Sequence, residues 1–197
     1  MRGDFVRDEE LLSKTRSIEL WDKNIIDEIE VGTVRGLCQI HKFLFQDVFE
    51  FAGEIRNVNI SKGNFRFAPL LFLRDNLKII ENMPESTFDE IVDKYVEMNV
   101  AHPFREGNGR ATRIWLDLIL KKNLKKCLDW AKIDKFEYLQ AMERSPVNSL
   151  EIKHLLKAAL TDKINDREVY MRGIQNSYYY EDLNKYNIYK ISEEKNL

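Results

Sequence analysis

The sequence has little of what marks disulfide-linked, secreted or membrane-spanning proteins. It contains two cysteines in 197 residues, Cys38 and Cys127, and they do not form a C-x-x-C pair. This argues against a zinc knuckle and is typical of a reducing compartment. No apolar run approaches the ~18 residues of a membrane span, and the first residues, Met1-Arg2-Gly3-Asp4, lack the apolar core of a signal peptide. We therefore expect a cytoplasmic protein with no membrane partner.

An excess of charge of one sign is missing as well. The chain has 31 Lys and Arg against 33 Asp and Glu, which gives a net charge of -2. Neither the charge nor any recognition motif indicates direct binding to nucleic acid. One stretch differs: between His102 and Lys126, seven Lys or Arg accompany only Glu106 and Asp117. This local excess suits a polyanionic ligand such as a nucleotide.

Most of the chain has the apolar spacing of helices. Between Thr33 and Phe45 the apolar positions recur every three or four residues, and Thr33 is a good N-cap. The chain length suits one domain with its own core, and no repeat or linker divides it. The fold class is therefore mostly α. Helices are predicted over 9–21, 33–45, 71–83, 86–100, from 110 onward, and over 134–144, 149–160 and 165–180.

One segment departs from this helical pattern. Val58 and Ile60 alternate with polar residues, the next four residues can form a turn, and Phe65 and Phe67 alternate again, which predicts a short β-hairpin. A lone hairpin is marginally stable, so it must lean on other elements. Its edge can pair with an extended segment of another protein. From these residues alone, the favoured interpretation is that the hairpin has a structural role and covers the core.

The segment from His102 to Arg113 combines an imidazole, a carboxylate, a glycine-rich turn and two guanidinium groups. Pro103 cannot continue a helix, so His102 is expected just past a helix end. The glycine turn is expected to open the next helix, where free N–H groups bind anions. Arg110 and Arg113 lie one turn apart. These groups suit phosphate-ester chemistry, with a base, a metal-binding carboxylate and an anion site.

The same twelve residues match the pattern H-x-F-x-(D/E)-G-N-G-R-x-x-R at every defined position, and so resemble the signature of the Fic family. The resemblance implies a Fic-like helical bundle with one short β-hairpin flap. It also implies transfer of AMP from ATP to a Tyr, Thr or Ser hydroxyl of a target protein, with loss of pyrophosphate. A Fic relative that phosphorylates its target has a lysine in place of Gly109, so phosphorylation is disfavoured.

Carried over by position, the signature implies a role for each residue. His102 is the general base on the target hydroxyl, and Phe104 packs under the loop. Glu106 binds Mg²⁺ between the α- and β-phosphates. The anion hole is formed by Gly107, Asn108 and Gly109, and the outer phosphates are held by Arg110 and Arg113. Residues 51–56 and the predicted hairpin resemble the family's flap, which holds the target by strand pairing; the docking residues are Ser61, Lys62, Gly63, Asn64 and Phe65.

A second resemblance concerns the C-terminal helix. Ser177 and Glu181 lie four residues apart, on one helix face, and resemble the inhibitory motif Ser/Thr-x-x-x-Glu-Gly/Asn that some Fic proteins carry. The glutamate of that motif pairs with the second signature arginine, here Arg113. The chain departs at Asp182. The expected division is an N-terminal helical extension (1–30), a Fic core (31–164), the inhibitory helix (165–183) and a tail (184–197).

Three other readings stay open at this point: removal of AMP from a modified protein, transfer of a different nucleotide, and nucleotide sensing without catalysis. The sequence does not identify the target protein, and it leaves open self-association and self-modification at Tyr178, Tyr179 or Tyr180.

Overall fold

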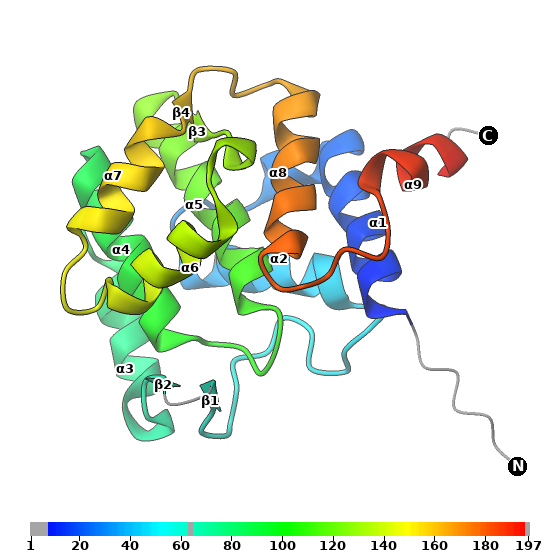
Figure 1. Cartoon of the computed structure of the whole chain (residues 1–197). Coiled ribbons are helices and arrows are strands. Elements are labelled where there is room, and N and C mark those ends of the chain that lie inside the picture. Colours follow the sequence, from blue (N-terminus) through cyan, green and yellow to red (C-terminus); the bar gives the residue numbers. More distant parts are fainter. Residues whose placement is uncertain (1–7, 63–64, 196–197) are drawn as a thin grey trace, which may run out of the picture.

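The chain folds as a bundle of helices around one central helix (Figure 1). The structure, a computed structural model, describes residues 8–62 and 65–195. The central helix, α5 (Asn108–Leu124), packs against α2 (Val34–Phe45), α4 (Phe88–Ala101) and α8 (Arg167–Tyr179). The remaining helices are α1 (Glu9–Asp22), α3 (Leu70–Glu81), α6 (Lys135–Arg144), α7 (Leu150–Ala158) and α9 (Ile188–Lys195), with short 3₁₀ helices at Ile25–Glu28 and Trp130–Lys132.

The helices begin where the sequence offers capping side chains. The Thr33 hydroxyl accepts a hydrogen bond from the Gly36 N–H and opens α2, as predicted. At α4, Thr87 and Glu90 form a reciprocal capping box, and aspartates cap α6 and α8. A capping side chain contributes about 1 kcal/mol of helix stability. The predicted helices are therefore confirmed, with ends shifted by a few residues.

The core surrounds α5, which is buried on nearly every side. Trp115, Leu116 and Ile119 are fully buried, because α2, α4 and α8 pack around them. The burial extends to the first turns of α5, where Arg110 and Arg113 are only 2% and 4% exposed. Since buried guanidinium groups must be paired, these two arginines form ion pairs with carboxylates from other parts of the fold.

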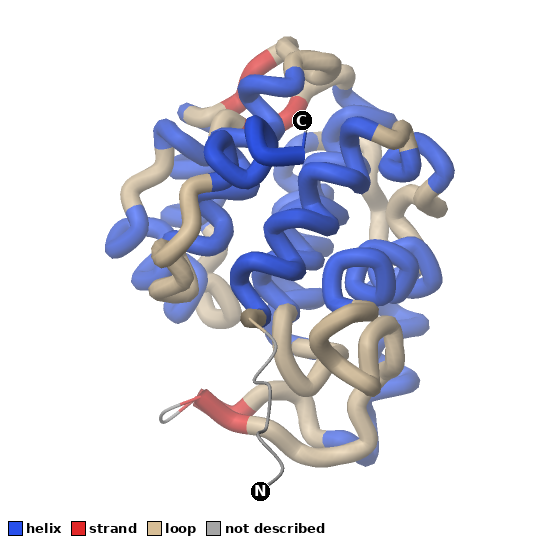
Figure 2. The backbone as a smooth tube through the Cα atoms, turned by 90° about the vertical axis from the view of Figure 1, so that its right-hand side faces the viewer, coloured by secondary structure: helices blue, strands red, loops and turns tan. Residues whose placement is uncertain are grey.

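Two small antiparallel sheets accompany the helices. The predicted hairpin is present: β1 (Ser61–Lys62) pairs with β2 (Phe65–Arg66), with Ser61 opposite Arg66. It projects at the lower edge of the molecule, away from the bundle (Figure 2). The second sheet pairs β3 (Cys127–Leu128) with β4 (Leu160–Thr161). It was not predicted from the sequence, because its two strands lie far apart in the chain and, unlike the hairpin, have no alternating residues and turn between them.

The predicted C-terminal tail is largely a helix. Residues 188–195 form α9, which packs against α1 and α8, and Ile188 and Ile191 are buried there. Two apolar residues three apart in a polar segment gave too weak a periodic signal to predict a helix. No helix within residues 8–62 and 65–195 is long and apolar enough to cross a membrane.

Candidate active site

His102 lies directly after α4, as Pro103 predicts. It caps the helix in the left-handed conformation, with φ 49°. Its Nδ1 lies 3.2 Å from the Asn99 carbonyl. Since a carbonyl only accepts, this contact selects the tautomer with a proton on Nδ1 and a lone pair on Nε2. The ring stacks on Phe67, with centroids 3.6 Å apart. The imidazole is thus oriented from both sides, with Nε2 as its basic atom.

Arg56 connects this histidine to the hairpin, a role that the sequence analysis missed. Its guanidinium is buried and, among the described residues, donates hydrogen bonds to four backbone carbonyls: to His102 at 2.8 Å, to Ala101 at 3.1 Å, to Val58 at 2.7 Å and to Ala68 at 2.5 Å. Val58 and Ala68 flank the hairpin on either side. Arg56 therefore fixes the base of the hairpin to the end of α4 that carries His102.

The glycine turn opens α5 as predicted. Gly107 is the N-cap of α5 with φ 76°, and a Cβ there would lie 2.5 Å from the Phe45 ring. Both facts require glycine at this position. At Gly109, a Cβ would lie 2.5 Å from Glu181 Oε1. The first turn of α5 is therefore bare enough for an anion to approach its backbone N–H groups.

Buried side chains hold the turn from below. The Asn108 amide makes two 2.8 Å hydrogen bonds with the backbone of Phe104, so Asn108 offers its backbone rather than its side chain to a ligand. Phe104 is fully buried and stacks on His41. His41 contacts the Glu106 carbonyl through Nε2 at 2.9 Å and accepts from the Gly53 N–H at 2.8 Å. Burial lowers the pKa of His41 to about 4, so the ring is neutral.

Glu106 is the predicted metal-binding residue. Its side chain is 60% exposed and lines the same cleft as His102. No group of three His, Cys, Asp or Glu in the described part of the chain could hold a metal ion by itself. Mg²⁺ is commonly held by one or two carboxylates together with substrate phosphates. A single accessible carboxylate beside the first turn of α5 fits that mode of binding.

Arg113 is fully engaged by the C-terminal helix. Its Nε donates to the Ser177 hydroxyl at 2.7 Å, and its Nη2 donates to the Ser177 carbonyl at 2.9 Å and to Glu181 Oε1 at 2.7 Å. The predicted partners Ser177 and Glu181 thus meet Arg113. Asp182 follows with φ 61° and contacts Lys135 at 2.5 Å. The left-handed backbone at this position accounts for the family's preference for Gly or Asn.

Arg110 has partners that the sequence analysis did not foresee. Its guanidinium forms ion pairs with Glu181 at 2.8 Å and with Glu9 of α1 at 2.7 Å. The rings of Phe45 and Tyr178 lie 4.8 and 5.3 Å from its central carbon. Burial acts to lower the pKa of Arg110, but the charges of Glu181 and Glu9 outweigh it, so the pKa lies above its usual range. Glu9 gave no sequence signal beyond the ordinary preference for acidic residues in a first helical turn.

One cleft collects these groups. Its lining includes the predicted base, turn, arginines and inhibitory carboxylate: His102, Glu106, Gly107, Asn108, Gly109, Arg110, Arg113 and Glu181. The hairpin side contributes Ile60, Ser61 and Phe67, and α1 contributes Glu9. Of the predicted docking residues, Ser61 lines the cleft, Lys62 and Phe65 pair in the backbone register, and Gly63 and Asn64 lie outside the described residues. Ser177 reaches the cleft only through Arg113.

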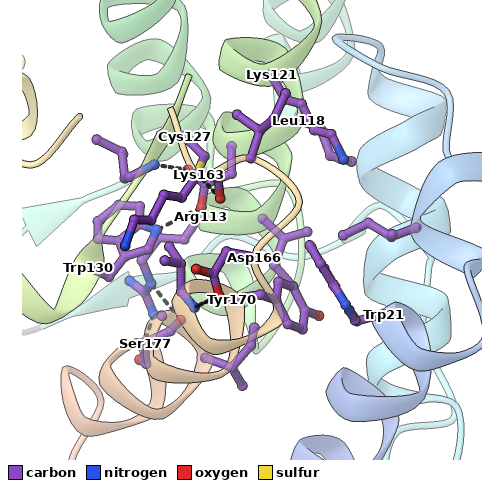
Figure 3. A pocket seen from close by; sticks show the side chains of 18 residues that line it. Trp21, Arg113, Leu118, Lys121, Cys127, Trp130, Lys163, Asp166, Tyr170 and Ser177 are labelled. Carbon is purple, nitrogen blue, oxygen red and sulfur yellow. Dashed lines mark hydrogen bonds between the residues drawn. The ribbon is translucent and has the colours of Figure 1, made fainter. Parts of the chain in front are cut away.

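A second, mainly apolar cavity lies on the other side of Arg113, between α5 and α8 (Figure 3). Trp21, Leu118, Trp130 and Tyr170 are among its lining residues. The Asp117 carboxylate also borders it and accepts 2.8 Å hydrogen bonds from the Leu128 N–H and the Trp130 indole. Burial raises the pKa of Asp117 to about 7. The middle of α8 is therefore not tightly packed against α5.

Comparison with known proteins identifies the domain that forms the cleft. Residues 32–120 match the model of the Fic/DOC family. The chain is 29% identical over 150 residues to the probable protein adenylyltransferase Fic of Salmonella typhimurium, covering 68% of this chain and 74% of that protein. It is 30% identical over 177 residues to the protein adenylyltransferase VbhT of Bartonella schoenbuchensis, covering 83% of this chain and 36% of that protein.

A solved structure agrees in fold. The crystal structure of BepC from Bartonella tribocorum with bound AMPPNP superimposes with a TM-score of 0.60 at 21% identity, covering 75% of this chain and 84% of that chain. The family match ends within α5, so Glu9 and Glu181 lie outside it. The helical fold, the complete signature and the sequence relatives agree, and residues 32–120 of this chain form a Fic/DOC domain.

Proposed function

We propose that this protein transfers AMP from ATP to a hydroxyl side chain of a target protein, and that Glu181, just after α8, restrains the reaction. One observation carries the proposal: a single cleft holds an oriented imidazole, the bare first turn of α5 and two buried arginines. The probable protein adenylyltransferases Fic of Salmonella typhimurium and Escherichia coli and the protein adenylyltransferase VbhT of Bartonella schoenbuchensis align over 68–83% of this chain and support the same activity.

The reaction follows from the positions of these groups. Nε2 of His102 accepts the proton of the target hydroxyl as its oxygen attacks the α-phosphorus of ATP. The bond between the α-phosphorus and the bridging oxygen breaks, and pyrophosphate leaves. The N–H groups at the start of α5 stabilise negative charge on the phosphate oxygens, and Arg110 and Arg113 hold the outer phosphates. Bound at Glu106, Mg²⁺ would neutralise phosphate charge.

The hairpin is proposed to place the target. Its strands are short and its outer edge is unpaired in the described part of the chain, so an extended target segment can add to it by main-chain hydrogen bonds. Ser61 and Phe67 line the cleft beside His102. A target segment on this edge would therefore present its hydroxyl side chain toward the histidine.

The proposed restraint of the reaction follows from the contacts that the C-terminal residues already make with the cleft arginines. Ser177 and Glu181 take the Arg113 donors that outer phosphates would need. A hydrogen bond between charged groups contributes roughly 1.5–3 kcal/mol, which corresponds to about a ten- to hundredfold shift in population. Glu181 is only 20% exposed, so water weakens the contact little. Nucleotide is thus expected to bind productively only when the end of α8 withdraws.

The test compares ATP labelled at the α-phosphate with ATP labelled at the γ-phosphate, using wild type, Glu181→Gly and His102→Ala with Mg²⁺ and a cell lysate as the source of targets. We expect protein label from the α position alone, stronger in Glu181→Gly and absent in His102→Ala. Label from the γ position would show phosphorylation instead. ATP binding without any label would contradict a transferase and favour nucleotide sensing or AMP removal.

A further inference from the structure

The first turn of α1 places a second carboxylate in the cleft. Glu9 Oε1 lies 2.7 Å from Arg110 Nη1, on a side chain that is 34% exposed. Glu9 lines the cleft together with His102 and Glu181. The carboxylate therefore lies on one of the two guanidinium groups that are proposed to hold the outer phosphates.

The charges around this end of α5 do not favour a polyanion. Arg110 and Arg113 supply two positive charges, while Glu9, Glu106 and Glu181 supply three negative charges within 2.7 to 3.9 Å of them. The set thus carries one net negative charge. If Glu181 alone withdraws, Glu9 still neutralises Arg110. Full attraction for a triphosphate requires the removal of both carboxylates.

Glu9 is not needed to anchor α1, because its neighbours already do so. Asp8 caps the helix and contacts Lys185 Nζ at 2.9 Å. The Glu10 carboxylate accepts from the backbone N–H groups of Lys185 and Tyr186, at 3.1 and 2.9 Å. Buried Lys14 bridges Glu10 Oε1 and the Tyr186 carbonyl, at 2.7 and 2.6 Å. These contacts fasten the first turn of α1 to the segment just after Glu181.

We propose that Glu9 is a second inhibitory carboxylate, which competes with nucleotide phosphate for Arg110, and that the first turn of α1 moves together with the end of α8. This rests on the proposed function, in which Arg110 holds phosphate. The contacts of Asp8, Glu10 and Lys14 make one unit of the two segments, so that a displaced Glu181 draws Glu9 away with it. The N-terminal helix thereby becomes part of the regulation of the site.

The test measures ATP binding by calorimetry in a His102→Ala background, where no turnover occurs. It compares Glu181→Gln, Glu9→Gln and the double variant, with exposed Glu28→Gln on the first 3₁₀ helix as a matched control. We expect Glu181→Gln to tighten binding tenfold or more, by roughly the worth of a charge-assisted contact. Adding Glu9→Gln should tighten it about three- to tenfold further, a smaller gain because Glu9 is more exposed. The control should change nothing.

The outcomes separate the two proposals. Equal or weaker binding in the double variant than in Glu181→Gln would overturn the competition, and Glu9 would then only orient Arg110. Tighter binding in the double variant, with no label transfer by proteins that keep His102, would overturn the transferase and leave the role of Glu9 standing. No ATP binding by any variant would overturn both.

A separate measurement tests whether the first turn of α1 and the end of α8 move together. Amide hydrogen exchange of the wild type, with and without saturating ATP, should show faster exchange at Glu181 and Leu183, whose N–H groups bond to the Tyr178 carbonyl. Lys185 and Tyr186, whose N–H groups bond to Glu10, should stay protected if the two segments move together. Faster exchange at residues 185 and 186 as well would show that the two segments separate, and would overturn the joint movement.

Discussion

The cleft has two walls that are built in opposite ways. The hairpin wall is held by Arg56, whose partners are all neutral backbone carbonyls. The wall formed by α1 and the end of α8 is held by charge pairs, in which Glu9, Glu181 and Asp182 meet Arg110, Arg113 and Lys135. A nucleotide phosphate does not compete with the neutral carbonyls that hold the first wall. It does compete with the carboxylates for the arginines of the second wall. The first wall suits a fixed docking site, and the second suits a switch.

The largest effect should come from the residue between the walls. Replacing His102 with Ala removes the proposed general base, whose usual contribution is about 10²–10⁴-fold in rate. We expect a loss of this size in the rate of label transfer, with ATP affinity changed little. His154→Ala, an exposed histidine, is the matched control and should retain full rate. Full activity of His102→Ala would contradict the assignment of His102 as the general base. The reaction would then not be centred on His102, between the two walls.

Breaking the charged wall should raise activity. Glu181→Gly removes the carboxylate from both arginines, and we expect transfer to increase roughly ten- to hundredfold, in line with the worth of a charge-assisted hydrogen bond. Ser177→Ala removes one neutral acceptor from Arg113 and should raise it only severalfold. Initial rates with saturating target measure both. An unchanged rate in Glu181→Gly would show that this wall is structural rather than regulatory.

Breaking the neutral wall should lower activity instead. Arg56→Lys keeps the charge but loses the planar donors that reach four carbonyls, so the base of the hairpin should loosen. We expect transfer to a protein target to fall about tenfold, with ATP affinity unchanged. Thermal unfolding controls for stability, which should fall by about 1–3 kcal/mol. A large loss of ATP affinity would show that the walls are not independent.

The last effect concerns stability rather than activity, at His41 beside the glycine turn. Its folded pKa is about 4, below the usual 6.5, so the unfolded chain takes up the proton first as the pH falls. The free energy of unfolding should therefore decrease between about pH 6.5 and pH 4, by on the order of 2–3 kcal/mol. Denaturant titrations at several pH values should show a flatter profile for His41→Gln and an unchanged one for His154→Gln. A wild-type slope retained in His41→Gln would assign the pH dependence to other groups.

Local features of the site were predictable from the sequence, and long-range ones were not. Pro103 and the glycines determine the local backbone, and they correctly placed His102 after one helix and the glycine turn at the start of the next. Glu9, Arg56 and His41 acquire their roles only from partners 46 to 101 positions away or from backbone groups that the fold brings together. The sequence analysis therefore assigned no individual role to Glu9 or His41, and it placed Arg56 in the flap-like segment without its contacts to the backbone of His102.

The tyrosines next to Glu181 show the same limit. The sequence analysis left self-modification open at all three, yet Tyr178 and Tyr180 are buried and Tyr179 is 43% exposed. The Tyr180 hydroxyl donates to the carbonyls of Trp130 and Ile133. Helical periodicity alone cannot show which side of α8 faces the core, because aromatic residues and charged residues both occur on several sides of this helix. Self-modification remains a proposal for Tyr179, which mass spectrometry after incubation with ATP can check.

Gly109 has a consequence for how such a chain can change over generations. A single added carbon at position 109 would lie 2.5 Å from Glu181 Oε1 and 2.8 Å from Arg113 Nη1, so any other residue there would displace both ends of the proposed inhibitory contact. If that contact restrains transfer, a substitution of Gly109 would release Glu181 but would also move the arginine that is proposed to hold phosphate. Lineages that lose the proposed restraint are then expected to alter Glu181, because that change leaves Arg113 in place, and to keep the glycine.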